Sequence, residues 1–155
     1  MSKVNLEQLK KLRSQTSASV ADVRSALEES GGDYDKALAL LKKRGAEIAE
    51  KKKERETGQG LVESYIHQNG KVGSLVVLLC ETDFVARTDE FKNLAHEIAM
   101  QVAAMEPKDI EGLLKQEYIR DPSMKIEDLI KQTIGKLGEN IRVKSFTRYQ
   151  IDSND

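Results

Sequence analysis

A run of apolar residues from Leu75 to Cys80 constrains the fold of this 155-residue chain more than any other segment. Such a run, bounded by polar residues, predicts a buried strand. It ends abruptly at Glu81, and a strong helical pattern begins near Thr88. The chain therefore passes from one rigid element to another through a short connection, which we expect at the protein surface.

Phe84 lies inside that short connection, among charged residues. An apolar ring held between two rigid elements suggests an anchor that enters a pocket of a partner protein. The alternative is that Phe84 folds back and covers the core. The spacing of the residues alone does not distinguish these two placements.

The N-terminal part of the chain, residues 1–46, predicts a bundle of three short helices that resembles a ubiquitin-associated domain. Ser19 followed by Asp22 is typical of a capping pair at the start of the second helix. Gly31 ends that helix, and Asp33 caps the third. The residues expected to face inward on the first two helices are Leu6, Leu9, Leu12, Val20, Val23, Ala26 and Leu27.

The remaining residues predict a charged helical linker, 47–59, and an α+β core domain, 60–155. Asn69-Gly70 is a turn signal between two strand-like segments, 61–67 and 72–80, and indicates an antiparallel hairpin. A closing strand should extend the hairpin to three strands packed with helices. The other expected elements are helices over 89–105, 110–118 and 126–137 and the closing strand over 141–151.

Composition argues against several classes of function. Lys and Arg (25) nearly balance Asp and Glu (26), so the net charge of −1 gives no footprint for binding nucleic acid. The single cysteine, Cys80, excludes an internal disulfide and a cysteine-based zinc site. Without a signal segment or a membrane-length apolar run, we expect a cytoplasmic protein that does not bind membranes. No catalytic, metal or cofactor motif is present, so we expect neither an enzyme nor a cofactor.

The central strand is apolar on both of its faces, although an antiparallel sheet commonly has one wet face. The helices over 89–105 and 126–137 can cover one face. We expect the other face to be covered by a second copy of the chain, in a homodimer, or by residues 106–124. Phe146 would join this second face, depending on the strand register. The two alternating sets are Val76, Leu78 and Cys80 on one face and Leu75, Val77 and Leu79 on the other.

The sequence TDFVAR, placed directly after an apolar strand, resembles the corresponding segment of the elongation factor Ts family. The N-terminal helical segment and the C-terminal segment KLGENIRVKSFTRYQ resemble the same family. The resemblance covers nearly the whole chain and implies a short form with a single core subdomain. It also implies a guanine-nucleotide exchange factor that acts on elongation factor Tu in bacterial-type translation.

The resemblance further implies roles for four residues of the connection. Asp83 and Phe84 would push into the nucleotide-binding domain of elongation factor Tu, where the Phe84 ring would enter an apolar pocket between two helices. The displaced helix would disturb the Mg²⁺ site, and GDP would then leave faster. Thr82 would hold the connection or bond to the partner's backbone, and Val85 would support the ring from behind.

A second implied contact lies at the turn into the second helix of the bundle, at Arg13, Val20, Ala21 and Arg24. The family commonly has glycines and methionines at this turn, whereas this chain has TSASVA over 16–21. Val20 and Ala21 offer a smaller apolar patch than methionines would. We therefore expect this contact to be weaker or to fit a variant partner. The rival function is a non-catalytic adaptor that binds proteins without exchange activity.

Overall fold

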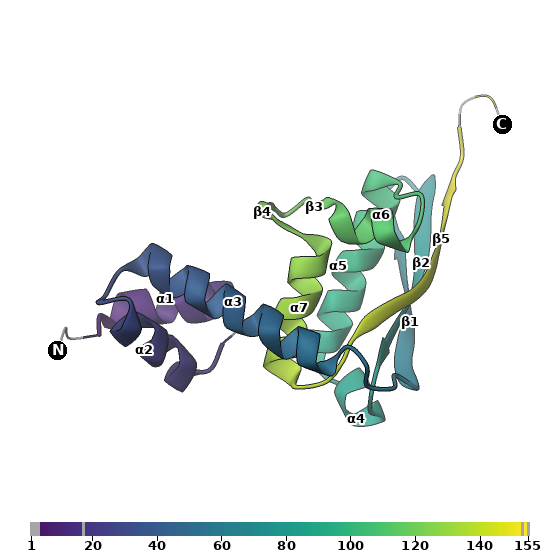
Figure 1. The fold of residues 1–155 in the computed structure, drawn as a ribbon. Coiled ribbons are helices and arrows are strands. Elements are labelled where there is room, and N and C mark those ends of the chain that lie inside the picture. Colours follow the sequence, from purple (N-terminus) through teal and green to yellow (C-terminus); the bar gives the residue numbers. More distant parts are fainter. Residues whose placement is uncertain (1–3, 17, 153, 155) are drawn as a thin grey trace.

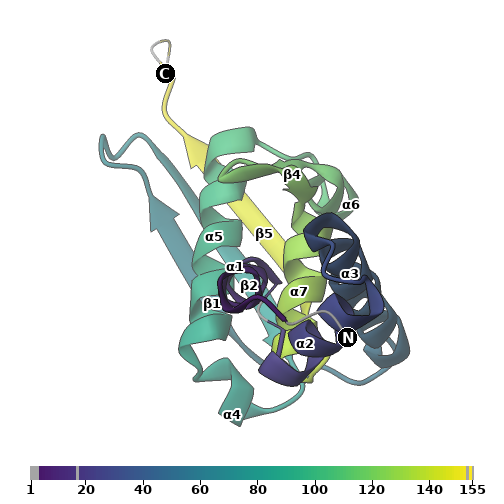
Figure 2. The same ribbon diagram turned by 90° about the vertical axis from the view of Figure 1, so that its left-hand side faces the viewer.

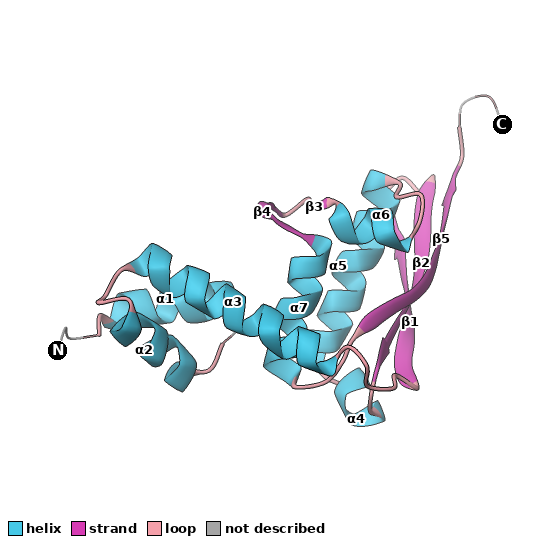
Figure 3. Ribbon diagram, viewed as in Figure 1, coloured by secondary structure: helices cyan, strands magenta, loops and turns pink. Residues whose placement is uncertain are grey.

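The computed structural model describes residues 4–16, 18–152 and 154, and has a helical bundle at one end and a helix-covered sheet at the other (Figure 1). Figure 3 separates the helices from the strands. The elements are α1 (Leu6–Thr16), α2 (Val20–Glu29), α3 (Tyr34–Lys52), β1 (Gln59–Ile66), β2 (Val72–Cys80), α4 (Asp83–Ala86), α5 (Asp89–Met105), α6 (Ile110–Lys115), β3 (Glu117–Tyr118), β4 (Asp121–Lys125), α7 (Ile126–Leu137) and β5 (Arg142–Gln150).

The N-terminal bundle begins its second and third helices at the predicted caps. The Ser19 side chain accepts a hydrogen bond from the backbone N–H of Asp22, and Asp33 caps α3 in the same way. The predicted inward set is confirmed except for Leu6 and Val20, which are exposed. Each is the first residue of its helix. Helical spacing predicts which face of a helix is buried, but not how far along that face the neighbouring helices extend.

Helix α3 joins the bundle to the core lobe as one continuous helix. Its Leu41 packs in the core of the bundle, and its Ala49 packs in the core of the lobe. A Cβ placed on Gly135 of α7 would lie 3.8 Å from the Cα of Gly45, so the two backbones approach closely where α3 crosses α7. The helices thus fix the bundle against the lobe.

The sheet has the strand order β1-β2-β5 and is antiparallel throughout, as predicted. Gly70 adopts φ 70° in the hairpin turn, a conformation that glycine adopts without strain. Val76, Leu78 and Cys80 face inward and are fully buried. Helices α5 and α7 cover this inner face, which confirms an α+β lobe (Figures 1 and 2).

The segment after α5 differs from the prediction, because the helix expected over 110–118 ends at Lys115 and a strand pair, β3 and β4, follows. The buried side chain of Gln101 explains the difference. Its Nε2 donates to the backbone oxygen of Glu117 (3.0 Å), and its Oε1 accepts from the backbone N–H of Ile119 (3.1 Å). Because these backbone groups are satisfied by α5, the segment leaves the helix after Lys115.

Residues 106–124 lie on the helix-covered side of the sheet, so the expectation that they cover the other face is wrong (Figure 1). Phe146 is also not on that outer face. It pairs with Val76 in the register, and residues directly opposite each other on antiparallel strands share a face. Its ring packs against the inner core.

The outer face of the sheet carries apolar side chains, and none of the described helices packs on it (Figure 1). Val62 is 63% exposed, Ile66 is 65% exposed and Tyr149 is 73% exposed. Leu75 is exposed as well, between the half-buried Val77 and the hairpin end. Among the residues described, this face therefore presents apolar side chains to solvent from all three strands.

Candidate functional site: the exposed turn at Phe84

The connection between β2 and α5 contains a one-turn helix, α4, that the sequence did not predict. Thr82 has the extended backbone of an N-cap residue (φ −123°, ψ 151°), and its side chain accepts from the backbone N–H of Val85. The turn lies at one edge of the lobe, as Figure 1 shows. It is rigidly joined to a strand before it and to α5, capped by Thr88, after it.

This single turn sends neighbouring side chains in opposite directions. Phe84 is 82% exposed, whereas Val85 is only 6% exposed and packs in the core. The alternative in which Phe84 folds back over the core is therefore excluded. Val85 anchors the turn from beneath, so the Phe84 ring projects from a supported base.

Asp83 and Arg87 flank the ring and form a salt bridge of 2.5 Å one turn apart, with both side chains exposed. A shallow hollow at this place is lined by Asp83, Phe84, Arg87 and Thr88. The surface is thus an apolar ring surrounded by polar groups, which is the composition of an interface anchor.

The base of the turn is bound by two residues to which the sequence analysis gave no role, Glu139 and Asn140. The Glu139 carboxylate accepts from the backbone N–H groups of Glu81 (3.1 Å) and Thr82 (2.9 Å), and from the Thr82 hydroxyl (2.7 Å). The backbone N–H of Asn140 donates to the Glu81 carboxylate (2.7 Å). Both residues lie in the segment GENI, residues 138–141. Sequence spacing gives no sign that this segment contacts the turn.

The residues of the second implied contact are all exposed, at the bundle end of the molecule. Val20, Ala21 and Arg24 lie on α2, and Arg13 lies near the end of α1. Ser17, which belongs to the same turn, lies outside the described residues. This surface is well separated from the Phe84 turn (Figure 1), so a partner that touches both would have to span the lobe and the bundle.

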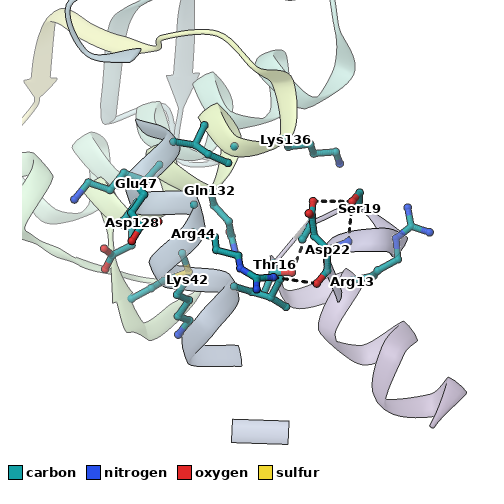
Figure 4. A pocket seen from close by; sticks show the side chains of 18 of the residues that line it. Arg13, Thr16, Ser19, Asp22, Lys42, Arg44, Glu47, Asp128, Gln132 and Lys136 are labelled. Carbon is teal, nitrogen blue, oxygen red and sulfur yellow. Dashed lines mark hydrogen bonds between the residues drawn. The ribbon is translucent and has the colours of Figure 1, made fainter. Parts of the chain in front are cut away.

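A pocket of about 640 Å³ lies between the bundle and the lobe, as Figure 4 shows. Arg13 is the one residue of the second implied contact in its lining. The lining includes six basic and three acidic residues, so the pocket favours an acidic surface. These charged residues are Arg13, Lys42, Arg44, Lys51, Lys131, Lys136, Asp22, Glu47 and Asp128.

The described residues include no group of three or more His, Cys, Asp or Glu side chains that could hold a metal ion. In the same part of the chain no helix combines the length and the apolar character needed to cross a membrane. Cys80 lies buried beneath the exposed turn, where its thiol donates to the Thr82 carbonyl (3.1 Å). Burial raises the pKa of this thiol to about 11, which keeps it unreactive at neutral pH.

Comparison with known proteins gives matches to one family, and the listed relatives align with nearly the whole chain. The model of the family described as "Elongation factor TS" matches residues 81–155. Proteins named elongation factor Ts from Thermotoga petrophila and Herpetosiphon aurantiacus are 42% and 36% identical, and the alignments cover 96% or more of each chain. One from Rippkaea orientalis is 40% identical, with 79% of its length covered. The Thermotoga alignment spans 191 positions, more than the 155 residues of this chain, so that relative has internal residues without a counterpart here.

Proposed function

The chain belongs to the elongation factor Ts family, and we propose that it is the guanine-nucleotide exchange factor for elongation factor Tu. Its membership makes it a translation elongation factor. We further propose its exchange activity, its partner and the residues that bind that partner. The site of action would be the cytoplasm, where translation takes place.

The observation that carries the proposal is the exposed Phe84 ring on a supported turn. A Phe ring that is 82% exposed between two rigid elements contributes little to the stability of its own fold. Its burial in an apolar pocket of a partner would contribute the binding free energy that an interface anchor provides. Thr82 caps the turn, Val85 supports it from the core, and Asp83 lies beside the ring to contact the partner's backbone.

Exchange by such a surface needs no covalent chemistry. The factor binds the nucleotide-free GTPase more tightly than the nucleotide-bound form, and linkage requires that factor and GDP weaken each other's binding equally. Insertion of Phe84 would shift a helix of the GTPase and disturb its Mg²⁺ site. The phosphate charge of GDP would then be poorly compensated, and GDP would dissociate faster.

The N-terminal surface would provide a second, weaker contact with the same partner. Val20 offers an exposed apolar side chain, and exposed positive charges are offered by Arg24, one turn later on α2, and by Arg13 on α1. Ala21 completes the patch on α2. Because the basic pocket adjoins Arg13, this end of the molecule favours an acidic surface of the GTPase.

The decisive experiment measures release of labelled GDP from elongation factor Tu with the wild-type chain and with Phe84→Ala. Loss of a central aromatic anchor costs about 2–4 kcal/mol of complex stability, which is about 30- to 1000-fold in affinity. The variant should keep the melting temperature of the wild type, since the ring is outside the core.

Met105→Ala is the matched control, because Met105 is also an exposed apolar side chain but lies at the far end of α5. It should exchange GDP normally. If the wild-type chain binds elongation factor Tu without accelerating GDP release, the adaptor function replaces exchange. Normal exchange by Phe84→Ala would remove the ring from the mechanism.

The outer face of the sheet supports a further proposal, that two copies of the chain pack sheet against sheet as a homodimer. An apolar face over three strands, uncovered by any described helix, is larger than the isolated apolar side chains that monomer surfaces carry. Two-fold symmetry would bury the same patch on both copies. The Phe84 turn follows the end of the central strand, outside the outer face, and would stay free.

A further inference from the structure

The loop between α7 and β5, residues 138–140, touches three segments that are distant in the sequence. Gly138 ends α7 with φ 77°, and its carbonyl accepts from Nζ of Lys52 at the end of α3 (2.7 Å). The next two residues bind the turn that carries Phe84. The loop is therefore the place where the end of α3 and the base of the turn meet.

The Glu139 carboxylate binds the base of the turn through both of its oxygens. Oε1 accepts from the backbone N–H groups of Glu81 and Thr82, and Oε2 accepts from the Thr82 hydroxyl. Strand β2 has ended by this point, so the sheet offers these two N–H groups no partner. Hydrogen bonds to an ionised carboxylate are roughly twice as strong as neutral ones.

Thr82 carries the effect of Glu139 to the ring. The same hydroxyl that donates to Glu139 accepts from the backbone N–H of Val85 and so caps α4. Glu139 therefore fixes the residue that starts the helical turn, two positions before Phe84. The direction of the Phe84 side chain follows from the direction of that turn.

A second set of contacts ties the same base to the linker after α3. The Glu81 carboxylate accepts from the backbone N–H of Asn140 and pairs with Arg55 (3.7 Å). The buried Asn140 side chain donates to the carbonyls of Lys53 (3.3 Å) and Arg55 (2.9 Å). The turn is thus held from its two sides, by Glu139 at the backbone and by Asn140 through Glu81.

We propose that Glu139 is a positioning residue for exchange, which holds the Phe84 turn in its binding conformation before the partner arrives. The inference rests on the proposed exchange function. A turn that is already ordered loses less conformational entropy on binding, so the same ring binds more tightly. Glu139 itself is only half-buried and belongs to neither hydrophobic core, so its contribution is to the turn rather than to the fold.

The test compares Glu139→Ala with Glu139→Gln in the full-length chain. The alanine variant loses all three hydrogen bonds. We expect its efficiency of GDP exchange to fall about tenfold, because the turn must then become ordered during binding, which costs binding free energy. The glutamine variant keeps an oxygen for the two backbone N–H groups and should lose less. Glu97→Gln is the control, because Glu97 is a buried carboxylate that pairs with Arg120 (2.7 Å), away from the turn.

Two further readouts separate positioning from a general loss of stability. The backbone amides of Glu81 and Thr82 should lose protection against hydrogen exchange in Glu139→Ala but not in Glu97→Gln. In the Phe84→Ala background, Glu139→Ala should cause no further loss of GDP exchange activity. The effects of two mutations are not additive when both act through the same side chain.

The proposal is overturned if Glu139→Ala exchanges GDP at the wild-type rate, or if it causes the same loss with and without the Phe84 ring. Unchanged protection of the Glu81 and Thr82 amides would overturn it equally. If the wild-type chain itself fails to release GDP, the proposed function fails. The amide protection then still decides whether Glu139 holds the turn.

Discussion

Cys80, at the end of the central strand, shows how much the burial of one residue changes its chemistry. Burial, and next the negative charge of Glu139, raises the pKa of the thiol from 9.0 to about 11. At pH 8 this lowers the thiolate fraction about a hundredfold relative to the unfolded chain, because each pKa unit is about a factor of ten. We predict a correspondingly slow reaction with a thiol reagent in the native protein and a fast one in denaturant, followed by absorbance.

The raised pKa of Cys80 also predicts how the stability of the native protein changes with pH. Because the folded state has the higher pKa, the unfolded state loses its proton first as pH rises from about 9 to about 11, and the native protein loses stability over that interval. Below pH 9 the thiol is protonated in both states and stability does not depend on it. A native chain that reacts at the denatured rate at pH 8 would show that Cys80 is accessible.

In the proposed binding mode, the start of α2 is the element whose contribution would depend most on charge. Val20 and Ala21 are small, so Arg13 and Arg24 provide the stronger attraction to an acidic partner surface. Rim charges act mainly on the association rate and are screened by salt. We predict that Arg24→Glu slows association with elongation factor Tu by up to about tenfold at low salt, measured by stopped flow, and that the difference shrinks as salt rises.

Lys108→Glu makes the same change in net charge at an exposed position after α5, away from both candidate surfaces. Equal slowing by the two variants would mean that overall charge, rather than the α2 surface, steers the encounter. An unchanged rate in Arg24→Glu would remove this element from the binding surface.

At the scale of the whole molecule, the uncovered sheet face predicts the oligomeric state. We expect sedimentation at micromolar concentration to give twice the chain mass of 17.4 kDa. Val62→Glu should give a monomer, because it places a charge without a partner in the centre of an apolar interface. Val62 is 63% exposed in one copy, so the single chain should tolerate the change.

Met105→Glu is the control for this variant, since it also adds a charge at an exposed apolar position but lies outside the sheet. It should stay dimeric. A wild-type chain that sediments at 17.4 kDa would show that the sheet face stays open to solvent.

Local chemistry in the sequence determined most elements of the fold. The caps at Ser19 and Asp33, the hairpin turn at Gly70 and the helix end at Gly138 each depend on residues within four positions, so they are readable without a structure. The apolar run of β2 also marked the centre of the sheet and showed that both of its faces carry apolar side chains. The resemblance of TDFVAR to the family pointed to the turn that carries Phe84.

Tertiary contacts decided the rest, because they join residues that no periodicity connects. The one-turn helix α4 exposes Phe84 and buries Val85. The strand register places Phe146 inside. Glu139 reaches Thr82 across 57 residues of sequence, and a side chain that satisfies distant backbone groups leaves no pattern in its own neighbourhood. The sequence alone therefore located the candidate anchor, whereas its orientation and the residue that holds it depend on how the elements pack.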